Sequence, residues 1–180
     1  MGSALVSAVE HKEQPRVGLL NNGTEEAKGS ALTKAAHQLL QASGLHYTGY
    51  TEARDVFSGA ADVIVTDGFT GNVIIKLSEG VSRLLMDILK TELTSRSMSK
   101  VGALLARPAF DAVRGRLDYR EYGGAPLLGI DGVVIVGHGR SDALAVENAV
   151  RVAIDAVNNK VVEAISAEIA AAQAHLDAKA

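Results

Sequence analysis

The sequence predicts an α/β protein built on an open, mostly parallel sheet. Short runs of Val, Ile and Leu alternate along its 180 residues with longer amphipathic stretches, which is the order of strands and crossover helices. The runs show little polar alternation, as expected for parallel strands that are covered on both faces. Glycine-rich polar turns follow three of the runs, where the ligand-binding turns of such sheets lie. A chain of this length is expected to form one domain.

Composition narrows the class of protein. Hydrophobic residues make up 47% of the chain and charged residues 22%, which fits a globular core and excludes a disordered or collagen-like chain. The absence of cysteine excludes disulfides, thiolate metal sites and a cysteine nucleophile. The sequence shows no signal peptide and no window of 18 apolar residues, so a cytoplasmic location is expected.

The first part of the chain is expected to supply three strands. Residues 1–11 resemble the end of a helix, and residues 16–21 form an apolar run closed by Asn-Asn-Gly, which is typical of a buried strand that ends in a turn. Thr24 is the expected N-cap of a following helix that ends at Gly44. Two further strands are expected, at residues 45–50 and 62–66.

Helices dominate the middle of the chain. After a turn at residues 67–72, apolar residues at helical spacing from Val73 to Leu89 predict one long helix. Two shorter amphipathic stretches follow at residues 98–105 and 110–117, and Pro108 is expected to interrupt the helix between them.

The last part of the chain is expected to return to the sheet. Residues 126–136 contain a Gly-Ile-Asp-Gly turn between apolar runs, which predicts a hairpin that adds one more strand. Ser141 is the expected cap of a long helix that reaches about as far as Gln173.

Charge is distributed unevenly. The net charge is −3, but residues 90–120 hold seven basic and three acidic residues, a local charge of +4 that leaves −7 for the remainder. This asymmetry indicates a basic surface suited to anionic lipid head groups or to an acidic partner, with a plain solvated face as the alternative. No basic stripe with interleaved aromatic residues is present, so no nucleic-acid partner is expected.

Three turns are candidates for binding an anion. They lie at residues 21–28, 67–72 and 137–142, and in a parallel sheet they would all lie along one edge. Backbone N–H groups at a helix N-terminus attract anions, and Lys28, Lys76 or Arg140 could add a full positive charge. A phosphate-bearing ligand therefore fits these turns.

Three polar side chains of these turns also have a plainer structural interpretation. His138 either donates to a ligand or only caps the end of its strand. Asp67 is interpreted as orienting its turn or a partner cation rather than acting as a base. Lys28 could instead lie on the solvated first turn of a helix.

The sequence lacks the motifs of several known nucleotide-binding, metal-binding and catalytic sites. The Gly137-His138-Gly139 sequence lacks the third glycine of a dinucleotide fingerprint, because Asp142 occupies that place. No Walker A loop, nucleophile elbow, zinc-binding helix or catalytic triad spacing occurs, and the histidines are scattered. No metal and no cofactor are expected.

Three long segments together resemble one family. The chain is similar to the C-terminal half of the bacterial acyl-ACP:phosphate acyltransferases of phospholipid synthesis over nearly its whole length, through RVGLLNNGTEEAKG, GYTEARDVFSGAADVIVTDGFTGNVIIKLSEG and DYREYGGAPLLGIDGVVIVGHGRSDALAVENAVR. The resemblance implies transfer of a fatty acyl group from acyl carrier protein to inorganic phosphate. It also implies a homodimer with a three-layer α/β/α fold related to phosphotransacetylases and isocitrate dehydrogenase.

The resemblance carries over residue by residue. Positions that match the family motifs are Asn21, Gly23, Glu25, Glu26, Lys28 and Gly29; Asp67, Gly68, Gly71, Asn72 and Lys76; and Tyr122, Gly123, Gly124, Ala125, His138 and Gly139. Four positions depart from the usual residues: Asn22, Thr24, Ser30 and Arg140. The family's N-terminal motifs, of the DAMGGD and GNTGA types, do not occur, so residues 1–180 are expected to be the C-terminal portion of a single α/β fold, truncated at the N-terminus.

These matches suggest a division of roles. We expect Lys28 or Arg140 to hold phosphate together with the glycine turns, and Asn72 and His138 to donate to the carbonyl oxygen as it becomes an oxyanion. The remaining candidates for phosphate or substrate binding are Asn21, Gly23, Asp67, Gly68, Gly71, Lys76, Gly139 and Ser141.

The helices at about residues 96–120 gain an expected role from the same resemblance. In the family the corresponding helices project from the body, help to form the dimer and contact the membrane peripherally. Here the expected patch for the inner face of the cell membrane, or for the second subunit, is Leu104, Leu105, Arg107, Phe110 and Arg114. Two other functions stay open: an acyltransferase of the phosphotransacetylase type that uses acyl-CoA, and an inactive module that only dimerises or associates with membrane.

Overall fold

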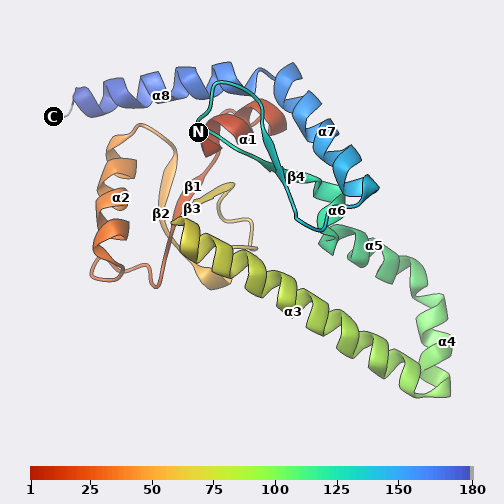
Figure 1. Cartoon of the computed structure of the whole chain (residues 1–180). Coiled ribbons are helices and arrows are strands. Elements are labelled where there is room, and N and C mark those ends of the chain that lie inside the picture. Colours follow the sequence, from red (N-terminus) through yellow and green to blue (C-terminus); the bar gives the residue numbers. More distant parts are fainter. Residues whose placement is uncertain (179–180) are drawn as a thin grey trace. The chain divides into compact units, whose positions relative to one another are not determined.

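The computed structural model describes residues 1–178, with Tyr119 described by its backbone alone. The chain forms two compact units. The first unit comprises Met1–Thr66, Ala125–Val136 and the chain from Val150 onward, and the second comprises Asp67–Gly124 and Gly137–Ala149. Figure 1 shows the order of the elements along the chain.

A three-stranded parallel sheet forms the centre of the first unit. Its strands are β1 (Val17–Asn21), β2 (Tyr47–Glu52) and β3 (Val63–Val65), in the order β2-β1-β3. Leu19 of β1 pairs with a residue on each side, Tyr50 in β2 and Val65 in β3. Val17 and Leu19 are buried in this central strand, as expected for a strand that has neighbours on both sides.

Helices complete the first unit. They include α1 (Gly2–Glu10), α2 (Ala31–Ala42), the short 3₁₀ turn η1 (Ala53–Asp55) and α8 (Val161–Asp177). α2 packs against β1 and β2, whereas α1 packs against β3 and α8. The buried core cluster consists of Ala4, Ala156, Val161 and Ile165. The predicted α/β class with a mostly parallel sheet is therefore confirmed, in agreement with an α/β/α layering.

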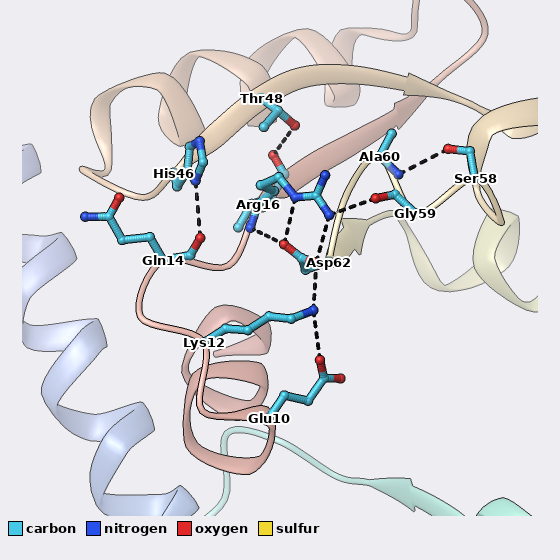
Figure 2. Close-up of polar contacts among 11 residues, drawn as sticks. Glu10, Lys12, Gln14, Arg16, His46, Thr48, Ser58, Gly59, Ala60 and Asp62 are labelled. Carbon is cyan, nitrogen blue, oxygen red and sulfur yellow. Dashed lines mark hydrogen bonds and ion pairs between the residues drawn. The ribbon is translucent and has the colours of Figure 1, made fainter.

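A network of charged groups fixes the start of β3. Asp62 precedes β3, and its backbone N–H and that of Val63 both donate to the carbonyl oxygen of Arg16. Lys12 pairs with Asp62 at 2.9 Å and with Glu10 at 3.0 Å, which joins the end of α1 to the same point (Figure 2). The network thus ties residues 10–16 to the start of β3, about 50 positions later in the sequence.

The second unit is mainly helical. It contains α3 (Gly68–Ser95), α4 (Ser97–Leu105), α5 (Arg107–Leu117), α6 (Tyr119–Tyr122) and the first residues of α7 (Ala143–Asn158). Pro108 lies in the first turn of α5, where its missing N–H costs no hydrogen bond, so the predicted interruption is confirmed. Many apolar side chains of α3 and α4 are exposed, among them Leu77, Leu84, Leu85, Met98, Val101, Leu104 and Leu105.

Two short strands form a separate sheet. β4 (Gly124–Pro126) and β5 (Ile135–Gly137) pair in a two-stranded sheet, and Leu127 N–H donates to Val134 O at 2.8 Å next to it. We predicted that this segment would add a strand to the parallel sheet. Within residues 1–178, β5 pairs with β4 instead, so that prediction is wrong.

Three helix boundaries differ from the sequence prediction. α3 begins at Gly68, so residues 68–72 belong to the helix and not to a turn before it. α2 begins at Ala31 and is capped by Ser30, whose Oγ accepts from Thr33 N at 3.1 Å, rather than by Thr24. Gly29 has φ +94°, which no helix accommodates, so the helix begins only after this residue. Lys160 has φ +52° and divides the predicted last helix into α7 and α8.

Candidate functional site

The first candidate turn follows β1 in the first unit. Asn21 ends this strand with its side chain buried, and Asn21 Nδ2 donates to the carbonyl oxygen of Gly23 at 3.0 Å. A Cβ atom at Gly29 would lie 2.6 Å from Asn21 Oδ1, and the positive φ at this position also favours glycine. The Asn21 side chain therefore packs directly against Gly29 and closes the turn.

Lys28 lies on this turn and not on a helix. Its backbone N–H donates to Glu25 O at 3.0 Å, and its side chain is exposed. A Cβ atom at Gly23 would lie 3.1 Å from Lys28 Cγ, so the stem of the lysine side chain folds back over this glycine. The structure thus brings Asn21, Gly23 and Lys28 together, whereas the interpretation of Lys28 as part of a helical turn is wrong.

The second candidate turn begins α3 in the second unit. Asp67 caps this helix: its Oδ1 accepts from Thr70 N at 2.9 Å and its Oδ2 accepts from Thr70 Oγ1 at 2.6 Å. These bonds from Thr70 lower the pKa of the Asp67 carboxyl group. The geometry agrees with the interpretation of Asp67 as a group that orders the turn.

Asn72 and Lys76 follow in α3. Both are exposed, and a spacing of four residues places them on one face of the helix. Gly71 lies just before them, and its N–H donates to Asp67 O at 2.9 Å, so the helical geometry is established from the first turn.

The third candidate turn connects β5 to α7, also in the second unit. His138 is its centre, because its carbonyl oxygen accepts from Ser141 N at 2.9 Å and from Ser141 Oγ at 2.7 Å. Arg140 N donates to His138 Nδ1 at 3.3 Å. Since Nδ1 accepts, a neutral His138 carries its proton on Nε2, a tautomer assigned from this hydrogen bond. The structure therefore groups His138, Gly139, Arg140 and Ser141 in one tight turn.

Asp142 caps α7, a role that we predicted for Ser141. Asp142 Oδ1 accepts from Ala145 N at 3.1 Å, while the Ser141 hydroxyl is directed to His138 O. The bond from Ala145 and the neighbouring Arg120 lower the pKa of the Asp142 carboxyl group. The correction is a shift of one residue, which the sequence leaves open because Ser and Asp are both good caps.

Sequence reasoning missed the ion pairs of Arg120. Arg120 Nη1 pairs with Asp142 Oδ2 at 3.1 Å, and its guanidinium also pairs with Asp118. Asp142 lies 22 positions after Arg120, and no periodic pattern links residues at such a separation. Only the Asp-Tyr-Arg sequence at 118–120 offered a local signal of charge pairing.

The helices α4 and α5 present the residues expected to meet a membrane or a second subunit. Leu104 and Leu105 of α4 are 69% and 79% exposed. Arg107 and Arg114 are exposed as well, and Arg107 Nε lies 3.8 Å from Asp111 Oδ2. Phe110 differs because it is half-buried, where it lines an open concavity of about 450 Å³ between α3, α4 and α5.

No metal-binding cluster of three or more His, Asp or Glu side chains occurs in residues 1–178. Over the same residues, no helix has both the length and the apolar character needed to cross a bilayer.

Comparison with known proteins identifies the family of the chain. The model of the family described as fatty acid synthesis protein matches residues 1–164. The chain is 48% identical to the phosphate acyltransferase of Syntrophotalea carbinolica over 169 residues, and these residues make up 94% of this chain and 49% of that protein. It is 45% identical to the phosphate acyltransferase of Anaeromyxobacter dehalogenans over 180 residues, which make up 100% of this chain and 50% of that protein.

A third relative agrees with these two. The phosphate acyltransferase of Pelotomaculum thermopropionicum is 50% identical over 155 residues, which cover 86% of this chain and 45% of that protein. The chain thus spans about half the length of the curated relatives that it matches. Because the family model matches most of the sequence, the chain belongs to the fatty acid synthesis protein family.

Proposed function

We propose that this chain acts as an acyltransferase that moves a fatty acyl group from acyl carrier protein to inorganic phosphate, giving acyl phosphate for phospholipid synthesis. The observation that carries the proposal is the 48% identity over 169 residues to a protein named phosphate acyltransferase. The three motif turns support it, because each places small polar residues next to glycine. Exposed cations follow: Lys28 adjoins Gly29, Arg140 adjoins Gly139, and Lys76 lies further along α3.

The reaction requires little from the protein beyond positioning and charge stabilisation. An oxygen of the hydrogen phosphate dianion attacks the carbonyl carbon of the thioester, a C–O bond forms, and the C–S bond breaks. The proton of hydrogen phosphate ends on the released thiol, whose ordinary pKa is near 8.5. Since phosphate is already an anionic nucleophile, neither a strong base nor a covalent acyl-enzyme is needed.

We assign phosphate binding to the turn of the second unit, where Gly139, Arg140 and Ser141 surround His138. The turn of the first unit, with Asn21, Gly23 and Lys28, is a separate candidate for binding an anion, and the Asn21 side chain closes it. Lys28 and Arg140 supply positive charge, and the glycines allow the backbone to approach an anion closely.

We assign stabilisation of the oxyanion to Asn72 and His138. The Asn72 amide is exposed in the second turn of α3, and its NH₂ group is a neutral donor. His138 donates from Nε2, because its Nδ1 accepts from Arg140 N. Asp67 orders the turn before Asn72, with Gly68, Gly71 and Lys76 as its substrate-facing neighbours.

We further propose that α4 and α5 associate with the inner face of the cell membrane while the enzyme acts in the cytoplasm. Leu104 and Leu105 are exposed apolar side chains, and Arg107 and Arg114 lie on the following helix. Apolar side chains flanked by arginines suit shallow insertion at an anionic surface. Packing of the same patch against a second copy in a homodimer is the competing role.

Substitution of the two proposed oxyanion donors tests the catalytic assignment. Asn72→Ala and His138→Ala are each expected to lower kcat by about 10²- to 10³-fold, the usual effect of losing one such donor. Thiol release from long-chain acyl carrier protein is the measurement, and Gln38→Ala, an exposed residue of α2, is the matched control. Unchanged turnover in both variants would defeat the assignment. A faster reaction with acyl-CoA than with acyl carrier protein would favour the phosphotransacetylase type of donor.

A further inference from the structure

A short segment of the second unit is held against the first two turns of α7. Asn148 of α7 is buried, and its Nδ2 donates to the carbonyl oxygen of Arg120 at 2.9 Å. Gly123 has φ +71°, and a Cβ atom there would lie 2.2 Å from the backbone nitrogen of Ala149. Only glycine permits this close approach, so residues 118–123 have one fixed position on α7.

The side chain of Arg120 adds a third connection, through two carboxylates. Its Nε donates to Asp118 Oδ1 at 2.9 Å, and its Nη1 donates to Asp142 Oδ2 at 3.1 Å. Asp118 also accepts from the backbone N–H of Arg120 at 3.0 Å, which fixes the carboxylate relative to the arginine. Arginine suits this bridge because its planar guanidinium presents several donors in a fixed geometry.

Asp142 transmits this connection to the start of α7. One carboxylate oxygen accepts from Arg120 and the other caps the helix through Ala145 N, so Arg120 fixes the orientation of the cap. The turn at residues 137–141 comes immediately before this cap and is closed on His138. A continuous series of bonds therefore runs from Asp118 through Arg120 and Asp142 to the turn.

The same bridge has an electrostatic effect. A carboxylate at the N-terminus of α7 repels a phosphate dianion that approaches the adjacent turn, since like charges interact over several ångströms even near the surface. The guanidinium of Arg120, at 3.1 Å from Asp142, offsets that charge. Removal of Arg120 would leave the negative charge uncompensated beside the turn.

We propose that Arg120 is a positioning residue for phosphate binding: it holds the Asp142 cap and the adjoining turn on α7 and cancels the charge of Asp142 at the phosphate site. The inference rests on the proposed function, in that it takes phosphate as the ligand of the 137–141 turn. Arg120 itself makes its bonds to the two carboxylates.

Amide hydrogen exchange tests the structural part without any need for activity. Arg120→Gln is expected to increase the exchange rate at Ala145 N and Ser141 N by roughly two- to five-fold, as expected for loss of an exposed ion pair. Arg116→Gln, an exposed arginine at the end of α5, is the matched control and should leave these rates unchanged. Unchanged rates at both amides in Arg120→Gln would overturn the proposal.

Titration with inorganic phosphate, followed by ³¹P line broadening, tests the electrostatic part. We expect Arg120→Gln to weaken phosphate binding by roughly two- to five-fold, the usual size of a charge effect at a helix terminus. Arg120→Lys should restore most of the affinity. Adding Asp142→Asn to Arg120→Gln should also restore it while exchange at Ala145 stays fast, a result that a purely structural role would not give.

The outcomes separate this inference from the proposed function. Wild-type affinity for phosphate in Arg120→Gln would overturn the inference, as would a failure of Asp142→Asn to restore affinity in that background. If the wild-type protein binds no phosphate while Arg120→Gln still accelerates exchange at Ala145, Arg120 holds the Asp142 cap, but the phosphate role of the turn, and with it the proposed function, is wrong.

Discussion

Arg16 and Asp62 form a bidentate ion pair that connects the residue before β1 to the residue before β3. Arg16 Nε donates to Asp62 Oδ2 at 3.0 Å, and Arg16 Nη2 donates to Asp62 Oδ1 at 3.0 Å (Figure 2). The backbone N–H of Arg16 donates to the same carboxylate at 2.8 Å. The pair therefore aligns the starts of two parallel strands, where a shift in register would change which side chains reach the core.

The stability of the protein is predicted to depend on Asp62 in a pH-dependent way. Hydrogen bonds from Arg16 and Lys12 hold the pKa of the Asp62 carboxyl group well below its usual range. A carboxyl group whose pKa is lower in the folded state stabilises the fold above its unfolded pKa, near 3.9, and this contribution is lost as the pH falls further. Asp62→Asn should lower the Tm at pH 7, and the difference from wild type should shrink below about pH 4.

Thermal unfolding between pH 2 and pH 8 checks this prediction. Asp55→Asn is the matched control, because Asp55 is a half-buried carboxylate with a single, longer contact, 3.7 Å from Arg54 Nε. Its effect on Tm should be small at every pH. A difference between wild type and Asp62→Asn that is unaltered from pH 7 to pH 2 would contradict the assigned role of the ion pair.

Gly29 is predicted to be more sensitive to substitution than a glycine of similar backbone conformation elsewhere. Gly29→Ala places Cβ 2.6 Å from Asn21 Oδ1 and forces alanine into φ +94°, which together should cost about 2 kcal/mol or more. Gly59 has φ +75° with nothing within 4 Å of its Cβ position, so Gly59→Ala should cost only about 1 kcal/mol. Urea unfolding measures both costs, and equal values would show that contact with Asn21 is unimportant.

Tyr47 is predicted to ionise well above the usual pH range of a tyrosine in the folded protein. Burial raises the pKa of Tyr47 to about 12, with a smaller effect from Tyr50. Its hydroxyl lies 2.7 Å from His37 Nδ1. Because the pKa is raised on folding, the neutral phenol stabilises the fold below pH 10, and this stabilisation is lost as the pH rises towards 12.

Spectrophotometric titration of the phenol groups checks this pKa. Tyr47→Phe should remove the component that titrates near pH 12, whereas Tyr122→Phe, at an exposed position, should leave that component in place. Persistence of the component near pH 12 in Tyr47→Phe would contradict the prediction.

The exposed leucines of α4 are predicted to mediate membrane association. Leu104→Glu combined with Leu105→Glu adds two negative charges at side chains that are 69% and 79% exposed, so folding should be little affected. Flotation with vesicles rich in anionic lipid should fall by at least about tenfold, since burial of each leucine and attraction to the lipid head groups are both lost. Leu32→Glu on α2, 65% exposed, is the matched control. Unchanged flotation of the double variant would defeat the membrane role and favour packing against a second copy.

The sequence predicted helices and strands correctly where a single local signal, such as an apolar run, a helical spacing or a proline, was strong. The apolar run before Asn21 became β1, the helical spacing from Val73 to Leu89 became part of α3, and Pro108 separated α4 from α5. In each case the side-chain period or a special residue specified the structure without help from distant parts of the chain.

The structure differs from the sequence prediction where a positive backbone φ angle or a contact with a distant residue determines the local conformation. Gly29 takes a positive φ that delays α2, and Lys160 takes one that ends α7, although the apolar pattern continues through it. The bridge between Arg120 and Asp142 is a tertiary contact, for which a single sequence has no periodic signal. The turns at residues 21–28 and 137–142 were identified correctly, whereas residues 68–72 lie in α3 and not in a turn before it. The sequence could not show that Asp67 and Asp142 serve as helix caps.

The most direct test of the proposed function is phosphate-dependent release of the carrier-protein thiol by the purified 180-residue chain. Long-chain acyl carrier protein serves as the donor, and hydroxylamine traps acyl phosphate as the hydroxamate. We predict that thiol release rises with phosphate concentration and that each thiol is matched by one hydroxamate. A folded chain that releases no thiol, or that releases it at a rate independent of phosphate, would contradict the account.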